Sequence, residues 1–280
     1  MSRLQIGLGA REALDVPGTG TVLAVYRRAA YLRLPGGIVA LVAPGVPPGP
    51  LWIRGEPVSG RAGRLPHAAT AGDQQGLSVG ASVTVGQEWL DVAGMRLPIA
   101  GADAWIGRLP DPVRLRAGLP LAMEILTTAP RSVLLADPWL PALRRAEAAV
   151  QRGELCRAAT FIGGLGPGLT PAGDDALAGI LLAHRALSGA GAEPHLLAAA
   201  RSGVTTDVSA ALLVWAARGQ AVEPVHDLLT ALAAQDWAGT VTAARGVASL
   251  GASSGADLLL GLRLGLVSAT AGTRSPTGRS

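Results

Sequence analysis

The chain has 280 residues and a formal net charge of +4, and this length allows one large domain or two smaller ones with buried cores. Hydrophobic residues make up 49% of the sequence and aromatic residues only 3%, so the core must consist mainly of alanine, leucine and valine. The basic residues are all arginines and are scattered along the chain, which argues against a nucleic-acid partner because such a partner needs a basic stripe with interleaved aromatics.

The single cysteine, Cys156, excludes an internal disulfide, and without a Cys/His cluster the sequence has no zinc signature. We expect Cys156 to be a small buried residue. No apolar run reaches the length of a membrane span, and the first six residues form no apolar signal region. The sequence therefore predicts a cytoplasmic protein with no membrane partner.

Residues 1–110 are predicted to form a β-rich domain, because short apolar or alternating runs are separated there by Gly and Pro. An antiparallel sheet or a partial barrel fits this spacing, with a hairpin turn at Ala93-Gly94. Residues 44–50 and 61–75 are expected to be loops, and His67 in the second loop is either an incidental surface histidine or a ligand contact. The expected strands cover residues 19–26, 30–33, 37–42, 51–54, 77–85, 88–92 and 95–98.

Residues 111–269 are predicted to form a mostly helical domain, which makes the fold class α+β. A first helix over residues 113–127 is expected to be interrupted near Pro120, and residues 270–280 are expected to be a disordered tail. Further helices are expected over residues 140–152, 193–202, 207–218, 223–234, 236–248 and 255–267.

The most distinctive stretch is Gly163-Gly-Leu-Gly-Pro-Gly-Leu-Thr-Pro-Ala-Gly-Asp-Asp-Ala-Leu-Ala-Gly179. Its glycines permit positive φ and close approach of a ligand to the backbone. Thr170 suits an N-cap and Pro171 a first helical position, so a helix is expected to run from here to Leu187 and to end at Gly189 and Gly191. The free N–H groups at such a helix start form an anion site for phosphate or carboxylate.

Asp174 and Asp175 complicate an anion site, because carboxylates in the first turn repel a phosphate unless a cation or a ligand N–H group lies between them. The plain structural alternative is that the helix dipole alone favours acidic residues in a first turn. The loop lacks the Lys of a P-loop and the pattern of a dinucleotide fold. A nucleotide is therefore not the expected ligand, and the structural alternative for the two aspartates stays open.

A segment similar to part of this motif lies 82 residues later, and we call this segment the echo. Ala172-Gly-Asp-Asp-Ala-Leu-Ala-Gly-Ile180 aligns without a gap with Ser254-Gly-Ala-Asp-Leu-Leu-Leu-Gly-Leu262, and the alignment pairs Asp175 with Asp257. Two glycine-opened helix starts of this kind predict two helices that pack closely through their glycines, with their acidic ends converging on a site. Chance similarity is the alternative in a chain so rich in Ala, Gly and Leu.

A third helix start, Thr205-Thr-Asp-Val-Ser209, supplies hydroxyls beside a carboxylate. Thr206 or Asp207 is an adequate N-cap without any ligand. If the three helix starts meet, they would line a pocket for a small, polar, oxygen-rich ligand. The candidate catalytic residues are Asp174, Asp175 and Asp257, and the candidate ligand-binding residues are Gly164, Gly166, Gly168, Thr170, Gly173, Thr206, Ser209, Ser253, Ser254 and Gly255.

The histidines indicate no catalytic or metal site. His184 lies within the expected helix after the loop, where a packed or locally capped histidine is expected. His195 and His226 have no acidic partners at metal-ligand spacing. No Ser-His-Asp triad is present in the sequence pattern, so the sequence names no nucleophile.

Together, Gly164-Leu-Gly-Pro-Gly-Leu-Thr-Pro-Ala-Gly-Asp-Asp175, Thr205-Thr-Asp-Val-Ser209 and Gly251-Ala-Ser-Ser-Gly-Ala-Asp257 resemble the bacterial family that includes a subunit of oxamate carbamoyltransferase. The resemblance covers most of the chain, although the N-terminal part matches only in pattern. It departs at Ala252, where a His-like polar residue is expected, and this puts a proton-transfer role there in doubt.

The resemblance implies transfer of a carbamoyl group between carbamoyl phosphate and a small amide such as oxamate, in purine catabolism through allantoin. It also implies partner subunits in a hetero-oligomeric transferase. Helix N-termini can stabilise phosphate and a developing oxyanion without a covalent nucleophile. Asp174, Asp175 and Asp257 are expected to orient an amine or carbamoyl NH2, or Asp174 and Asp175 to hold a Mg2+ ion. No other cofactor is expected. The alternative is a non-catalytic ligand-binding or assembly subunit.

Overall fold

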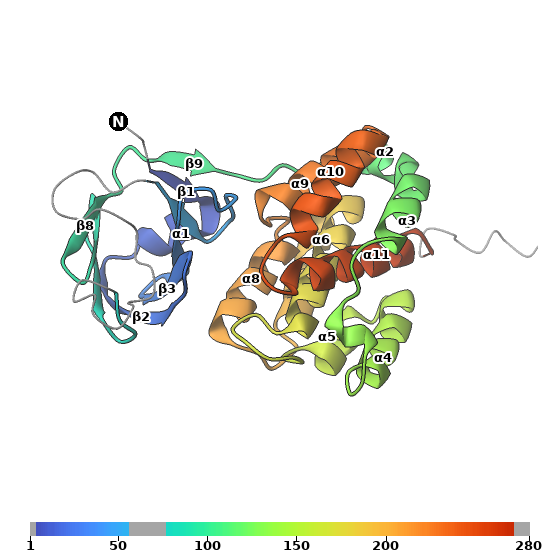
Figure 1. The fold of residues 1–280 in the computed structure, drawn as a ribbon, viewed down its shortest axis with the longest axis horizontal. Coiled ribbons are helices and arrows are strands. Elements are labelled where there is room, and N and C mark those ends of the chain that lie inside the picture. The colour runs from blue at the N-terminus through green and yellow to red at the C-terminus, as the bar shows by residue number, and fades with distance from the viewer. Residues whose placement is uncertain (1–3, 56–76, 272–280) are drawn as a thin grey trace, which may run out of the picture. The chain divides into compact units, whose positions relative to one another are not determined.

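The computed structural model describes residues 4–55 and 77–271, and the chain divides into two compact units, Met1–Ile106 and Gly107–Ser280. The first unit is a curled mixed sheet that forms a half-barrel, and the second is helical (Figure 1). The predicted α+β class, with a β-rich part followed by a helical part, is confirmed. None of the described helices combines the length and apolarity needed to cross a bilayer.

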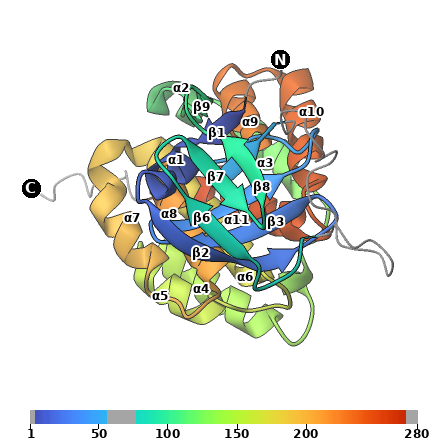
Figure 2. The same ribbon diagram turned by 90° about the vertical axis from the view of Figure 1, so that its left-hand side faces the viewer.

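The sheet of the first unit has the strand order β8-β7-β6-β2-β3-β4-β5-β1-β9. It is mixed, because β1 pairs with β9 and β4 with β5 in parallel, whereas the other neighbours are antiparallel. Its curl is visible in Figures 1 and 2. The strands are β1 Gln5–Gly7, β2 Gly18–Val25, β3 Ala29–Leu34, β4 Gly37–Val42, β5 Trp52–Arg54, β6 Ser82–Val85, β7 Trp89–Val92, β8 Met95–Pro98 and β9 Asp103–Trp105.

The predicted strands are found, but the sequence reading missed β1, β9 and the helix α1, Leu8–Leu14. These elements are too short to show a clear period. Helix α1 packs on the sheet through buried Ala10, Ala13 and Leu14, and the Arg11 Nη2 donates to the carbonyl oxygen of Ala102 at 2.8 Å. Contacts with the sheet, rather than a cap, therefore hold this helix in place.

The predicted hairpin turn at Ala93-Gly94 joins β7 and β8, with φ of 54° and 86° at the two residues. The Gly94 N–H donates to Asp91 Oδ1 at 2.9 Å. Residues 44–50 form the first predicted loop. The second, residues 61–75 with His67, lies outside the described residues.

The helical unit contains ten α-helices and two short 3-10 helices among the described residues. The sequence reading missed α5, Leu155–Ile162, on which Cys156 is half-buried against the core rather than fully buried as expected. The α-helices are α2 Pro112–Ala117, α3 Leu119–Thr127, α4 Leu140–Gln151, α5, α6 Ala172–Ser188, α7 Glu193–Ala200, α8 Asp207–Ala217, α9 Glu223–Ala233, α10 Trp237–Ala248 and α11 Ser254–Ala271, and the 3-10 helices are Val133–Leu135 and Ala190–Ala192.

Three helix boundaries differ from the prediction. The break in the first helix falls at Gly118, because Pro120 is tolerated in the first turn of α3 and does not need to interrupt it. Helix α6 begins at Ala172 with Pro171 as its N-cap, so Thr170 does not cap it. Helix α11 continues to Ala271, beyond the expected end at residue 267, with Ser268 buried and Ala269 partly buried against the core. The rest of the expected disordered tail lies outside the described residues.

Helices α6 and α11 form the central pair of the helical unit (Figure 1). Both helices contribute buried leucines to two hydrophobic clusters, one with α4, α5, α7 and α8 and the other with α2, α3, α9 and α10. Helix α6 is accordingly buried on most of its surface, and its C-terminus is closed by Gly189 at φ 73°, as predicted. This pair fixes where the two predicted motif helices begin.

Candidate functional site

Glycines bring the backbones of α6 and α11 into direct contact. A Cβ added at Gly179 would lie 2.4 Å from the carbonyl oxygen of Leu258, and one added at Gly261 would lie 1.9 Å from that of Ala176. These are the glycines that the 82-residue echo aligns, so the predicted close packing of the two helices is confirmed. Only residues without a side chain allow this separation of the helix axes.

Asp175 and Asp257 occupy the same place in the two helices, since each is the fourth residue of its helix. Each carboxyl group has one buried oxygen, Oδ2, without a hydrogen-bond partner among the described residues. The two carboxyl groups are close enough for the charge of Asp257 to raise the pKa of Asp175. The acidic helix starts therefore converge, as the repeat predicted.

Burial dominates the electrostatics of both carboxyl groups. It raises the pKa of Asp175 to about 8, against the lowering effect of the Ser254 hydroxyl and with smaller increases from Asp257 and Asp174. Burial also raises the pKa of Asp257, against the hydroxyls of Ser132 and Ser253 and the N–H of Val133. At neutral pH, Asp175 therefore holds a proton in much of the population.

Asp174 differs from its neighbour because both of its oxygens are used within the chain. It is 2% exposed, its Oδ1 accepts from the Gly164 N–H at 2.9 Å, and its Oδ2 accepts from the Thr205 hydroxyl. Asp174 therefore ties the glycine-rich loop to the segment before α8. The sequence placed Asp174 and Asp175 together as candidates, and the structure separates their environments.

The third helix start also meets the loop. Thr206 caps α8 by accepting from the Ser209 N–H at 3.1 Å, and its hydroxyl donates to the Leu169 carbonyl oxygen at 2.6 Å. The hydroxyl of Ser209, which is buried, donates to the same oxygen at 3.4 Å. Thr206 is thus the N-cap that the sequence allowed, and it also holds the loop.

The loop reaches α11 as well. The hydroxyls of Thr170 and Ser254 lie 3.4 Å apart, so the loop touches the N-terminal ends of α6, α8 and α11. The predicted meeting of three helix starts is confirmed in this geometry. Their hydroxyls, however, are largely engaged with one another and with backbone carbonyls.

Ser132 and Val133 belong to the same cluster, although the sequence analysis did not include them. The Ser132 hydroxyl donates to Asp257 Oδ1 at 2.5 Å, and the Val133 N–H donates to the same oxygen at 3.2 Å. These residues precede Asp257 by more than 120 positions and carry no motif. Only the fold could place them beside it.

The candidate glycines fall into two groups. Gly164, Gly166 and Gly168 adopt φ of 73°, 111° and 98°, and a Cβ at Gly168 would meet no atom within 4 Å. At Gly173 and Gly255, the Cβ position is filled by the carbonyl oxygens of Ile162 and Val247. Only Gly168 faces open space, because a Cβ at Gly164 would lie 2.5 Å from the Val204 carbonyl oxygen and one at Gly166 would lie 2.9 Å from the Ala172 nitrogen. Gly173 and Gly255 allow backbones to pack.

Two histidines are explained by packing. His184 on α6 bonds through Nε2 to the Ser268 hydroxyl of α11 at 3.0 Å, and burial lowers its pKa to about 4. The His226 Nε2 accepts from the Ala221 N–H at 3.1 Å, so Nδ1 carries the hydrogen that is donated to the Arg108 carbonyl oxygen. Within the described part of the chain, no three His, Cys, Asp or Glu side chains gather in a metal-binding group.

Comparison with known proteins points to the same stretch. The family model described as oxamate carbamoyltransferase subunit AllH matches residues 162–266. The match begins at the last residue of α5, ends within α11 and contains the glycine-rich loop with Asp174, Asp175 and Asp257. No solved structure matches the chain. Residues 162–266, which hold the glycine-rich loop and the starts of α6, α8 and α11, are thus similar to the family of the oxamate carbamoyltransferase subunit AllH.

Proposed function

We propose that the chain is the part of an oxamate-type carbamoyltransferase that holds a small anionic ligand at the converging N-termini of α6 and α11. The observation that carries the proposal is the pair of buried, unpartnered oxygens on Asp175 and Asp257. Buried polar atoms without partners are rare in folded proteins and are costly to maintain. A ligand that supplies hydrogen-bonding groups would satisfy both.

The raised pKa of Asp175 removes the main objection to an anion at this place. A protonated Asp175 carries no charge and can donate a hydrogen bond to a ligand oxygen. The backbone N–H groups at the start of α6 and α11 add positive partial charge. An ionised Asp257, which is an acceptor, would then orient the NH2 of a carbamoyl group or of an amide such as oxamate.

The proposed transfer joins the amide nitrogen of the acceptor to the carbamoyl carbon and breaks the bond from that carbon to the phosphate oxygen. The phosphate leaves with the bonding electron pair, and the nitrogen loses a proton. This chemistry needs positioning and stabilisation of developing charge more than a protein nucleophile. The site supplies both without a covalent intermediate.

A Mg2+ ion remains a proposal of the same kind. Asp174 contributes poorly to such a site, because its two oxygens already accept hydrogen bonds from Gly164 and Thr205. The unpartnered oxygens of Asp175 and Asp257 are the carboxylate ligands that this chain offers. Phosphate oxygens and water would have to complete an octahedral shell.

A second candidate function is a non-catalytic ligand-binding or assembly subunit. The observation in its favour is that the hydroxyls of Thr205, Thr206 and Ser209 are all bonded within the chain. The loop therefore presents few groups that are free to move a proton. In this case, partner subunits would carry out the chemistry, in line with the description of the matching family as a subunit.

Calorimetry on the purified chain tests the proposal. Carbamoyl phosphate, phosphate and oxamate are titrated with and without Mg2+ into the wild type and the Asp175→Leu variant. The matched control is Asp111→Asn, which changes the N-cap carboxylate of α2 to an equally good cap. We expect binding to the wild type and the control, and at least a tenfold weaker affinity for Asp175→Leu, because leucine cannot donate a hydrogen bond to the ligand.

Equal affinities for all three proteins would show that the ligand binds elsewhere. If a folded wild-type chain binds none of the ligands alone but gains binding and transfer activity with partner subunits, the assembly function is favoured. Transfer activity of the chain alone would exclude a purely non-catalytic role.

A further inference from the structure

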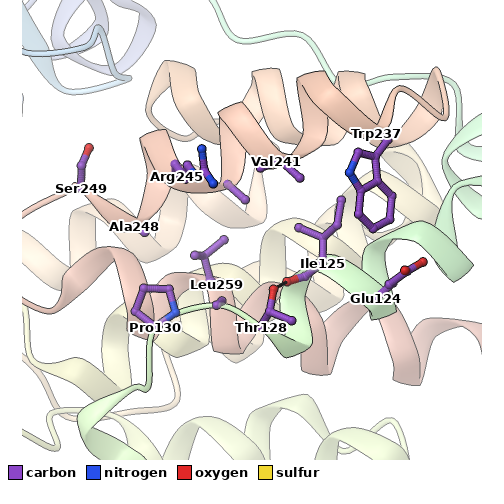
Figure 3. Close-up of a pocket in the computed structure, with 12 residues that line it drawn as sticks. Glu124, Ile125, Thr128, Pro130, Trp237, Val241, Arg245, Ala248, Ser249 and Leu259 are labelled. Atoms are coloured by element: carbon purple, nitrogen blue, oxygen red, sulfur yellow. Dashed lines mark hydrogen bonds between the residues drawn. The ribbon is translucent and has the colours of Figure 1, made fainter.

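A cavity of about 570 Å³ opens along one side of α10 (Figure 3). The other walls come from the C-terminal end of α3 with residues 129–130 and from Leu259 of α11. Its volume falls within the range of binding cavities, but it is elongated along a helix. This shape suits a second helix more than a compact ligand.

Helix α10 presents an apolar and basic stripe to this cavity. Trp237, Val241 and Arg245 are spaced four residues apart, so they lie on one face over about 12 Å of helix. Ala244 and Ala248 line the cavity beside this stripe and leave room for a side chain from outside. Trp237 is 51% exposed, which is unusual for the largest apolar side chain in a sequence so poor in aromatics.

The charges of the cavity stand at opposite ends. Glu124 and Trp237 lie at one end, and Arg245 and Ser249 at the other (Figure 3). Both charged side chains are exposed, and neither forms an ion pair within the described ranges. The surface therefore carries a negative and a positive end, with Val241 midway between Trp237 and Arg245.

We propose that this face binds a second copy of the chain, with the two α10 helices antiparallel about a two-fold axis near Val241. A two-fold axis brings each residue against its counterpart on the other half of the same stripe. Arg245 of each copy then meets Glu124 and Trp237 of the other. The first contact is an ion pair, and the second is a cation–π contact.

A second copy fits this surface because the surface is self-complementary. When the second copy runs antiparallel, its basic end faces the acidic end of the first copy. Along the cavity, Glu124 of α3 and Trp237 form an acidic and aromatic end, Val241 an apolar centre and Arg245 a basic end. The same order read backwards supplies the opposite charge at each end. The Trp237 indole of one copy also provides the bulk that fills the other copy's cavity above Ala244 and Ala248. Trp and Arg are the side chains that most often dominate interface energies.

Sedimentation velocity of the full chain at several concentrations tests this proposal. We expect a concentration-dependent dimer in the wild type. We expect Arg245→Glu and Glu124→Arg, each alone, to raise the dissociation constant at least tenfold, because like charges then meet twice per dimer. Arg144→Glu on the exposed face of α4 makes the same charge change away from the surface and is expected to leave the dimer intact.

The two-fold geometry makes a sharper prediction for mixtures. An equimolar mixture of Arg245→Glu and Glu124→Arg chains should form a heterodimer, because every cross-contact then joins opposite charges. The double variant should dimerise with itself for the same reason. Circular dichroism of each variant checks that these exposed substitutions leave the fold unchanged.

Three results would overturn the proposal. The first is a wild type that stays monomeric up to on the order of 100 μM, where a micromolar interface is occupied. The second is a dimer that neither single reversal weakens, since its interface must then lie elsewhere. The third is a mixture of the two single variants that stays monomeric.

Discussion

Asp175 on α6 and Asp257 on α11 are the fourth residues of two helices that touch through glycine, and each keeps one buried carboxylate oxygen unpartnered. A chain selected only for stability would fill both places with donors or with apolar residues. These two unpartnered oxygens therefore lower the stability of the folded chain.

The glycine crossing should be intolerant of a single methyl group. Gly261→Ala would place Cβ 1.9 Å from the Ala176 carbonyl oxygen, so we expect a loss of about 3 kcal/mol or more in unfolding free energy. The matched control is Gly246→Ala on α10, where the nearest atom to the new Cβ lies at 3.6 Å. It should be neutral or stabilising by up to about 1 kcal/mol. Urea unfolding measures both, and equal effects would contradict the packing argument.

Asp175 should make stability fall as the pH rises. Its pKa is 3.8 without the fold and about 8 within it. Folding therefore takes up a proton between these values, and the free energy of unfolding decreases across this pH range. Asp175→Asn has no such proton, so its stability relative to the wild type should increase from pH 4 to pH 8. Thermal melting of both proteins across that range checks the sign, and a constant difference would contradict it.

Replacement of Asp174 should destabilise the fold, because both of its carboxylate oxygens accept hydrogen bonds. Asp174→Asn keeps only one acceptor oxygen for the two donors Gly164 and Thr205, so we expect a loss of about 2 kcal/mol in stability. Thr205→Ser retains the hydroxyl and should unfold close to the wild type, whereas Thr205→Val should lose part of the same stability. If Asp174→Asn is as stable as the wild type at pH 7, the loop is not held by this carboxylate.

Ser132 should support Asp257 rather than a ligand directly. Ser132→Ala removes the 2.5 Å donor to Asp257 Oδ1 and leaves that oxygen with fewer partners in a fully buried position. We expect a loss of about 1–3 kcal/mol in stability and a further rise in the pKa of Asp257. Carboxyl NMR titration follows that pKa. An unchanged pKa with unchanged stability would show that the serine is dispensable.

Local sequence patterns predicted much of the fold, because hydrophobic periodicity and the turn and cap residues that end helices and strands depend only on nearby residues. The hairpin at Ala93-Gly94 and the helix ending before Gly189 follow from short turn and cap signals. The close packing of α6 and α11 was also predictable, because the echo repeated Gly179 at Gly261 on the same face as the acidic residues. Helix α1 and strands β1 and β9 gave no such signal, since contacts rather than pattern form them.

The site was predictable only in outline. The sequence brought Asp174, Asp175 and Asp257 together, but it gave no means of knowing that Asp174 is fully engaged by Gly164 and Thr205. The number of hydrogen bonds to a carboxylate depends on segments far away in sequence. Ser132 illustrates the same limit, since its place beside Asp257 depends on the path between α3 and α4.

The central position of α6 has a dynamic consequence. Five other α-helices, α2, α5, α7, α8 and α11, contact it, and most of its residues from Ala172 to Ser188 are buried. Its amide hydrogens should therefore exchange with solvent only when the whole helical unit opens. A ligand that binds at the first turn of α6 therefore contacts a rigid helix. Any rearrangement on ligand binding is then expected in segments outside α6, such as residues 249–253 before α11.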